Sequence, residues 1–75
     1  MLLQQGKSYR AQIELGFFEA MAPNEVVAGK LREVGFQDVE VTGSGAKRQA
    51  TGRWPLASRE VSLPSQVKGA TQVGT

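Results

Sequence analysis

Polar and apolar residues alternate along three stretches of the chain, residues 8–15, 37–42 and 47–54. A period of two is typical of a β-strand with one buried face, so each stretch predicts a strand. The last two are joined by the short link Gly43-Ser44-Gly45, which predicts a hairpin. Pro55 follows at once and either ends the third strand or confines what comes next to a sheet edge.

Between the first and second strands, the period changes to that of a helix. Pro23 and Asn24 are typical of a helix start, with Asn24 a candidate N-cap, and Gly35 is typical of a helix end. Gly29 in the middle lowers helix propensity and predicts close packing against a neighbour. The apolar stripe recurs at i, i+4 and i+7: Val27, Leu31 and Val34.

The order strand, helix, strand, strand predicts an α+β fold, a small βαββ unit with one helix packed on a three-stranded sheet. A unit of this kind is also half of a ferredoxin-like fold. We expect an N-terminal arm over residues 1–7, a core domain over 8–56, and an extended C-terminal segment or tail over 57–75. The polar composition after residue 65 is typical of a flexible tail.

A chain of 75 residues has room for one modest core, which buries only about 60% of the surface exposed on unfolding. Small folds of this size usually gain support from disulfides, a metal or a partner chain. The sequence has no cysteine and no histidine, so a disulfide and the commonest metal ligands and general base are excluded. We therefore predict a protein that is not an enzyme, has no cofactor and no metal, and is stabilised by partner chains.

Charge is distributed unevenly along the chain. Residues 1–43 carry four basic and six acidic side chains, whereas residues 44–75 carry five basic side chains and one acidic side chain. This polarity suits head-to-tail contact between copies or an acidic partner, although counts this small also scatter by chance. No apolar run approaches signal-peptide length or the ~18 residues of a membrane span, and no compartment is indicated.

Two segments invite a catalytic or phosphate-binding interpretation, and both have a plainer one. Residues 43–48 combine glycines with Lys47 and Arg48, but the glycine spacing is not that of a P-loop, and a hairpin turn is favoured. Asp38 and Glu40 lie two apart on a predicted strand, and Glu14 joins them if its strand is adjacent. Without a nucleophile or an oxyanion donor nearby, a solvated strand face is favoured over an acid–base pair.

Aromatic and basic residues supply the candidate contacts with a partner. Trp54 lies close to Arg53 and Arg59, the ingredients of nucleic-acid binding by stacking and charge, although the only tryptophan of a small domain also suits its core. Phe17 and Phe18 are adjacent in a connection and cannot easily share one small core. Either one of them lies at the surface as a contact patch, or both are buried, one under the helix and one beside the sheet. The partner-binding residues that we predict are Phe17, Phe18, Arg53, Trp54, Arg59, Val67 and Val73.

These observations favour a structural or interaction subunit of a larger, repetitive assembly, such as a virion or an accessory complex. Its partners would be copies of itself or other subunits. The hairpin or the tail would pair with a neighbouring chain by strand addition at a sheet edge. The alternative is a ligand-binding module for peptidoglycan or nucleic acid.

The peptidoglycan alternative follows from a resemblance. The run Tyr9, Gln12, Gly16 and Phe18, followed by a helix that ends at Leu31 and Gly35-Phe36, resembles the first half of a SPOR-type peptidoglycan-binding domain over about 35 residues. The resemblance implies glycan binding. The glycine and the phenylalanine lie later than in that pattern, and no second repeat follows, so no binding residues are assigned from it.

Overall fold

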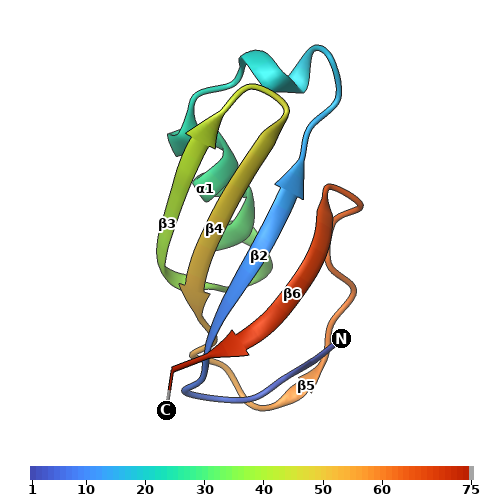
Figure 1. The fold of residues 1–75 in the computed structure, drawn as a ribbon. Coiled ribbons are helices and arrows are strands. Elements are labelled where there is room, and N and C mark those ends of the chain that lie inside the picture. Colours follow the sequence, from blue (N-terminus) through green and yellow to red (C-terminus); the bar gives the residue numbers. More distant parts are fainter. Residues whose placement is uncertain (75) are drawn as a thin grey trace.

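The computed structural model describes residues 1–74, which form a small α+β fold with one helix and two sheets (Figure 1). The α+β class and the strand–helix–strand–strand order predicted from the sequence are therefore confirmed. Among these residues no helix is long and apolar enough to cross a membrane. In chain order the elements are β1 (Leu2–Leu3), β2 (Ser8–Glu14), the 3-10 turn η1 (Glu19–Met21), α1 (Asn24–Val34), β3 (Gln37–Ser44), β4 (Lys47–Arg53), β5 (Arg59–Glu60) and β6 (Val67–Val73).

The main sheet has four strands in the order β3-β4-β2-β6, and every neighbouring pair is antiparallel. The predicted three-stranded sheet is wrong in its strand number, because β6 adds a fourth strand. β6 comes from the segment that we expected to be a tail, and it pairs along β2 from Ser8↔Val73 to Ile13↔Val67. An edge strand gains its hydrogen bonds from one neighbour and needs few apolar side chains, which is why composition alone indicated a tail.

The N-terminal segment forms a separate two-stranded sheet with β5, through the pairs Leu2↔Glu60 and Leu3↔Arg59. The amino group of Met1 donates to the carboxylate of Glu60 and to the carbonyl of Val61. Leu3 is completely buried by this arrangement. Residues 1–7 are thus held against the rest of the fold.

The helix differs from the prediction at its start. Asn24 is the first helical residue, and Pro23 takes the N-cap position without a side-chain hydrogen bond. The side chain of Asn24 is used for tertiary contacts instead. Gly35 follows the last helical residue with φ 131°, as the sequence predicts for a helix end.

The core consists of two apolar clusters on the helix side of the main sheet. In the first cluster, Val27, Ala28 and Leu31 of α1 pack on Ile13, Val39 and Ala50 of the sheet. The second cluster is formed by Leu3, Tyr9 and Trp54.

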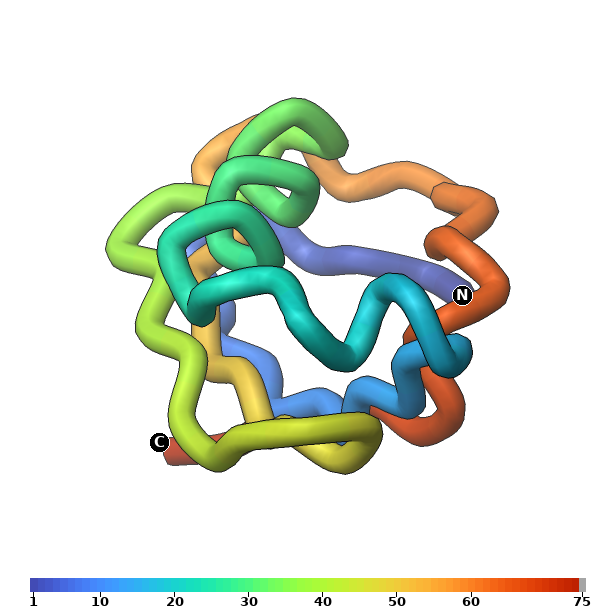
Figure 2. Tube along the Cα trace, turned by 90° about the horizontal axis from the view of Figure 1, so that it is seen from above, coloured from blue at the N-terminus to red at the C-terminus, as the bar shows by residue number. Residues whose placement is uncertain are grey.

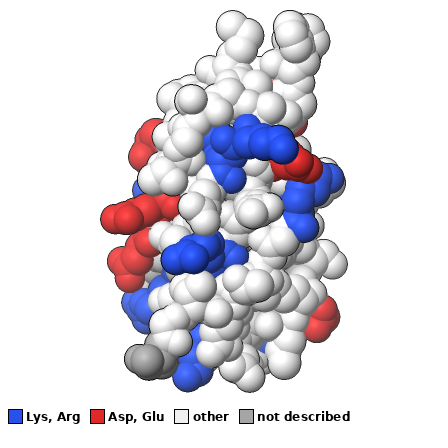
Figure 3. All heavy atoms as spheres, viewed as in Figure 1, with Lys and Arg blue, Asp and Glu red and all other residues white. Residues whose placement is uncertain are grey.

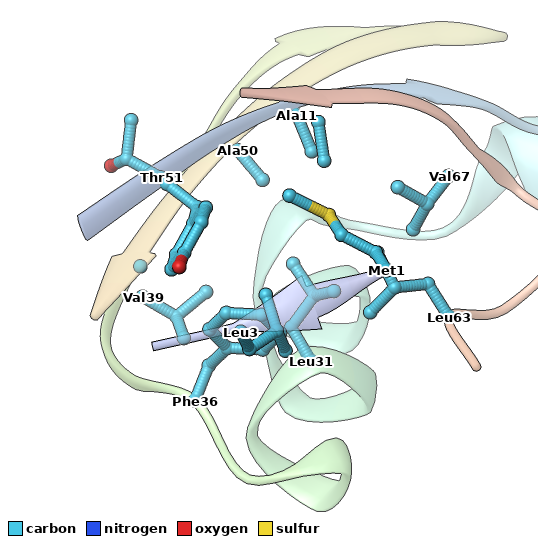
Figure 4. A pocket seen from close by; sticks show the side chains of 13 residues that line it. Met1, Leu3, Ala11, Leu31, Phe36, Val39, Ala50, Thr51, Leu63 and Val67 are labelled. Atoms are coloured by element: carbon cyan, nitrogen blue, oxygen red, sulfur yellow. The ribbon is translucent and has the colours of Figure 1, made fainter. Parts of the chain in front are cut away.

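Between the clusters lies an apolar cavity of about 30 Å³, into which the side chain of Met1 points (Figure 4). Its volume is about that of one water molecule, and its lining is apolar, so we interpret it as a packing void.

Two glycines of the helix region give opposite predictions for substitution by alanine. At Gly35 a Cβ atom would lie 3.0 Å from Leu56 Cδ1 and 3.1 Å from the Trp54 ring, and the positive φ adds strain. Gly35→Ala is expected to lower the free energy of unfolding by about 1–3 kcal/mol. At Gly29 no atom beyond its chain neighbours and the backbone of its own helix lies within 4 Å of the Cβ position, so the close packing predicted there is wrong.

Gly29→Ala is the matched control, and it is expected to raise the free energy of unfolding by about 0.5–1 kcal/mol. Urea denaturation of both variants measures the difference. Equal effects of the same sign at the two positions would contradict the described helix end.

Candidate functional site

The loop between β2 and α1 exposes three large apolar side chains at one end of the molecule. Phe17 is 84%, Phe18 83% and Met21 81% exposed, and the two phenylalanine rings meet edge to face at 5.3 Å. We call these three residues the aromatic tip. In Figure 3 this end of the molecule is white, with the Lys, Arg, Asp and Glu side chains of that view gathered further down.

The backbone of this loop is folded by its own hydrogen bonds. Ala20 N–H donates to the carbonyl of Gly16 at 2.8 Å, and Ala22 N–H donates to that of Glu19 at 2.9 Å. Leu15 N–H donates to the carbonyl of Ala46 at 2.7 Å, which ties the loop to the β3–β4 turn. Seen from above, the cyan segment passes from the sheet to the green helix (Figure 2).

The side chain of Arg48, on β4, holds the loop in place. Its side chain is buried, and its guanidinium donates to the carbonyls of Ala20 (2.9 Å) and Gly45 (3.1 Å) and to Oδ1 of Asn24 (2.9 Å). Asn24 in turn donates through Nδ2 to the carbonyl of Gly43 at 3.1 Å. One planar cation therefore joins the tip loop, the start of α1 and the β3–β4 hairpin.

Glu19 fixes the loop from the other side. Its Oε1 accepts a hydrogen bond from Gly16 N–H at 2.9 Å, and its Oε2 accepts one from Gln66 Nε2 at 2.7 Å. The Gly16 hydrogen bond, followed by that of Gln66, holds the pKa of Glu19 below its ordinary value of 4.5. The loop is thereby connected to the segment that leads into β6.

An apolar groove of about 440 Å³ adjoins the tip. It lies between α1 and the start of β6, and Leu15, Glu19 and Ala22 of the tip loop form part of its wall. Val26 lines it and is 49% exposed, so the groove is open to solvent on its helix side. Its other apolar walls include Ile13, Val27, Leu31, Pro64 and Val67.

The structure brings together only some of the residues predicted to bind a partner. Phe17 and Phe18 form the tip, and Val67 lines the adjoining groove. Val73 lies at the opposite end of β6 and pairs with Ser8.

The predicted aromatic–basic group has a structural role in this fold. Trp54 is 0% exposed, donates through Nε1 to the carbonyl of Ala57, and meets Phe36 edge to face. Arg59 lies 5.5 Å from the centre of the indole ring. Arg53, at the far end of β4 from the tip, binds the side chains of Asp38 and Gln37. Trp54 is therefore a core residue here and offers no ring to a partner.

The three acidic residues considered together in the sequence, Glu14, Asp38 and Glu40, do not form one group in the structure, because they lie on strands that are not neighbours in the sheet. Glu14 of β2 pairs with Lys47 of β4, and β4 separates it from Asp38 and Glu40 on β3. Over residues 1–74 no group of three or more acidic side chains is placed to hold a metal ion. Residues 43–48 form the expected hairpin, with its turn at Gly45-Ala46.

Sequence reasoning missed the polar residues that hold the tip. Arg48 falls on the same side of its strand as Ala50 and Trp54, and a cation on an apolar face was the available signal. Glu19 and Gln66 are 47 residues apart, and nothing in their local sequence predicts the contact.

No protein-family model, curated protein or solved structure matches this chain. The likeness to SPOR-type domains therefore stays a resemblance over the residues named above.

Replacing Arg48 is expected to release the tip loop. Arg48→Met removes three hydrogen bonds and leaves their part-buried acceptors without this donor, so the free energy of unfolding should fall by about 1–3 kcal/mol. Amide hydrogen exchange at residues 16–22 should become faster. Arg10→Met is the control, since Arg10 is an exposed arginine on β2. If the two variants lost stability equally, the role given to Arg48 would be refuted.

Acid is expected to loosen the same loop. Because the folded-state pKa of Glu19 is lowered, its contacts are complete above pH 4.5 and are lost as the pH falls through that lowered pKa. The amide proton of Gly16 reports this directly by NMR, and its chemical shift should titrate with a midpoint below 4.5. Glu19→Gln should abolish the transition, and a midpoint above 4.5 in the unmodified chain would argue against the hydrogen bond.

Proposed function

We propose that this chain is a non-enzymatic interaction subunit of a larger protein assembly, of the kind found in virions and accessory complexes. The aromatic tip is the surface through which it docks. The observation that carries this proposal is that three large apolar side chains, each more than four-fifths exposed, stand on a loop that a polar network holds fixed.

Exposure and rigidity together favour docking. A loop that merely connects two elements gains nothing from displaying two phenylalanines and a methionine to water, because each such side chain stabilises a fold by about 1.5–3 kcal/mol only when buried. Aromatic side chains that enter a partner's pocket typically dominate the energy of an interface. Because the loop is already fixed, little conformational entropy is lost when a partner binds.

The ligand-binding alternative has less support. Stacking with nucleic-acid bases needs an exposed ring beside cations, and Trp54 is buried while Arg53 and Arg59 lie away from the tip. The tip itself carries no cation, which also disfavours an anionic membrane surface.

Open sheet edges support a repetitive assembly. Within residues 1–74, β3 and β6 are the outer strands of the main sheet, and each has a partner strand on one side only. Since β6 already pairs with β2, the strand addition that we expected from a free tail would use the outer edge of β6 instead. Such edges would supplement the contact made by the tip.

The docking role is tested by photo-crosslinking in the cells that naturally make the protein. A photoreactive phenylalanine analogue at position 17 should form adducts with a discrete protein, identified by mass spectrometry. The same analogue at Leu2, which is exposed but lies in β1, is the control and should give few adducts. Equal labelling at both positions, or none at position 17, would contradict docking through the tip.

A substitution gives the complementary prediction. Phe17→Ser combined with Phe18→Ser should change the free energy of unfolding by no more than about 0.5 kcal/mol, because both rings are exposed. Thermal denaturation measures this at a concentration at which both chains are monomeric, because self-association would add to the apparent stability. A loss of several kcal/mol would mean that the rings support the fold and are not free for a partner.

A further inference from the structure

We infer that the partner of the aromatic tip is the apolar groove of a second copy of this chain. In the resulting dimer each copy inserts its tip into the groove of the other around a two-fold axis. This inference rests on the proposed function and names the partner that the tip fits.

The tip and the groove adjoin each other. Leu15, Glu19 and Ala22 belong to the tip loop and also form one wall of the groove. A projection beside a matching recess makes one self-complementary patch, which is what a two-fold symmetric interface requires. Two copies facing each other can therefore exchange tips and form a closed dimer, and the outer edges of β3 and β6 remain available for contacts with further subunits.

A copy does not fill its own groove. The carbonyl of Ala20 is bound by Arg48, and Glu19 is bound by Gly16 and Gln66, so the loop is fixed with its rings in solvent. Phe17 and Phe18 keep more than four-fifths of their surface exposed although other residues of their loop line an apolar groove. The groove is thus left to another molecule.

The volumes agree. A protein cavity of about 150 Å³ holds a benzene molecule. The groove of about 440 Å³ therefore has room for the rings of both Phe17 and Phe18.

The buried area favours reciprocal exchange over one-way insertion. An aromatic side chain buries roughly 150–250 Å², so four rings would bury roughly 600–1,000 Å². Insertion of a single tip would contribute half of this. Reciprocal exchange therefore brings the contact closer to the roughly 1,200–2,000 Å² that stable specific interfaces bury.

The test is the mass in solution, measured by light scattering and sedimentation over a dilution series of the full chain. The unmodified chain should form a dimer that dissociates on dilution. Two variants should each be monomeric: Phe17→Ser/Phe18→Ser, which lacks the tip, and Val26→Glu, which places a charge in the groove and suits the first turn of the helix. Leu2→Ser is the control and should remain dimeric.

Mixing the two monomeric variants decides between this geometry and others. The first variant keeps its groove and the second keeps its tip, so the mixture should form heterodimers through one contact, more weakly than the unmodified pair. If the tips packed against each other instead, Val26→Glu alone would remain dimeric and the mixture would form no heterodimers, and the inference would be overturned.

A monomeric unmodified chain at every concentration would also overturn the dimer. The crosslinker at position 17 then separates the two claims. Adducts with a different protein would leave the docking role standing, whereas no adducts at all would remove both.

Discussion

The buried guanidinium of Arg48 is the interaction on which the arrangement at this end of the molecule depends. Among residues 1–74 no acidic side chain pairs with it, and it is stabilised by two carbonyls and one amide oxygen, which belong to three different segments. A group of this kind is costly to bury unless its donors are satisfied. Satisfying them fixes the tip loop, the first residue of α1 and the β3–β4 hairpin in one geometry. The exposure of Phe17 and Phe18 follows from that geometry.

Much of the fold could be predicted from periodicity. The alternation of Tyr9, Ala11 and Ile13 and the helical stripe of Val27 and Leu31 gave the right elements, because these side chains are buried on one face. β6 could not be predicted in the same way. Its position at a sheet edge depends on backbone pairing with β2, and its side chains record little of that pairing.

Of the candidate site, only apolar residues could be predicted from the sequence. Two adjacent phenylalanines in a connection gave a surface contact as one of two alternatives, and the structure places both rings at the surface. The polar residues that hold them come from distant parts of the chain, and long-range side-chain contacts leave no local pattern. For Trp54 the basic sequence neighbours suggested a binding surface, but in the structure its ring lies in the second cluster of the core.

The central claim is that the aromatic tip of one copy lies in the groove of another. Isotope-filtered NMR on a mixture of labelled and unlabelled chains tests it most directly. We predict intermolecular nuclear Overhauser effects between the ring protons of Phe17 or Phe18 and the methyl groups of Val26 and Val67. A dimer in which these rings show intermolecular effects only to each other, or a monomer with none, would contradict the account.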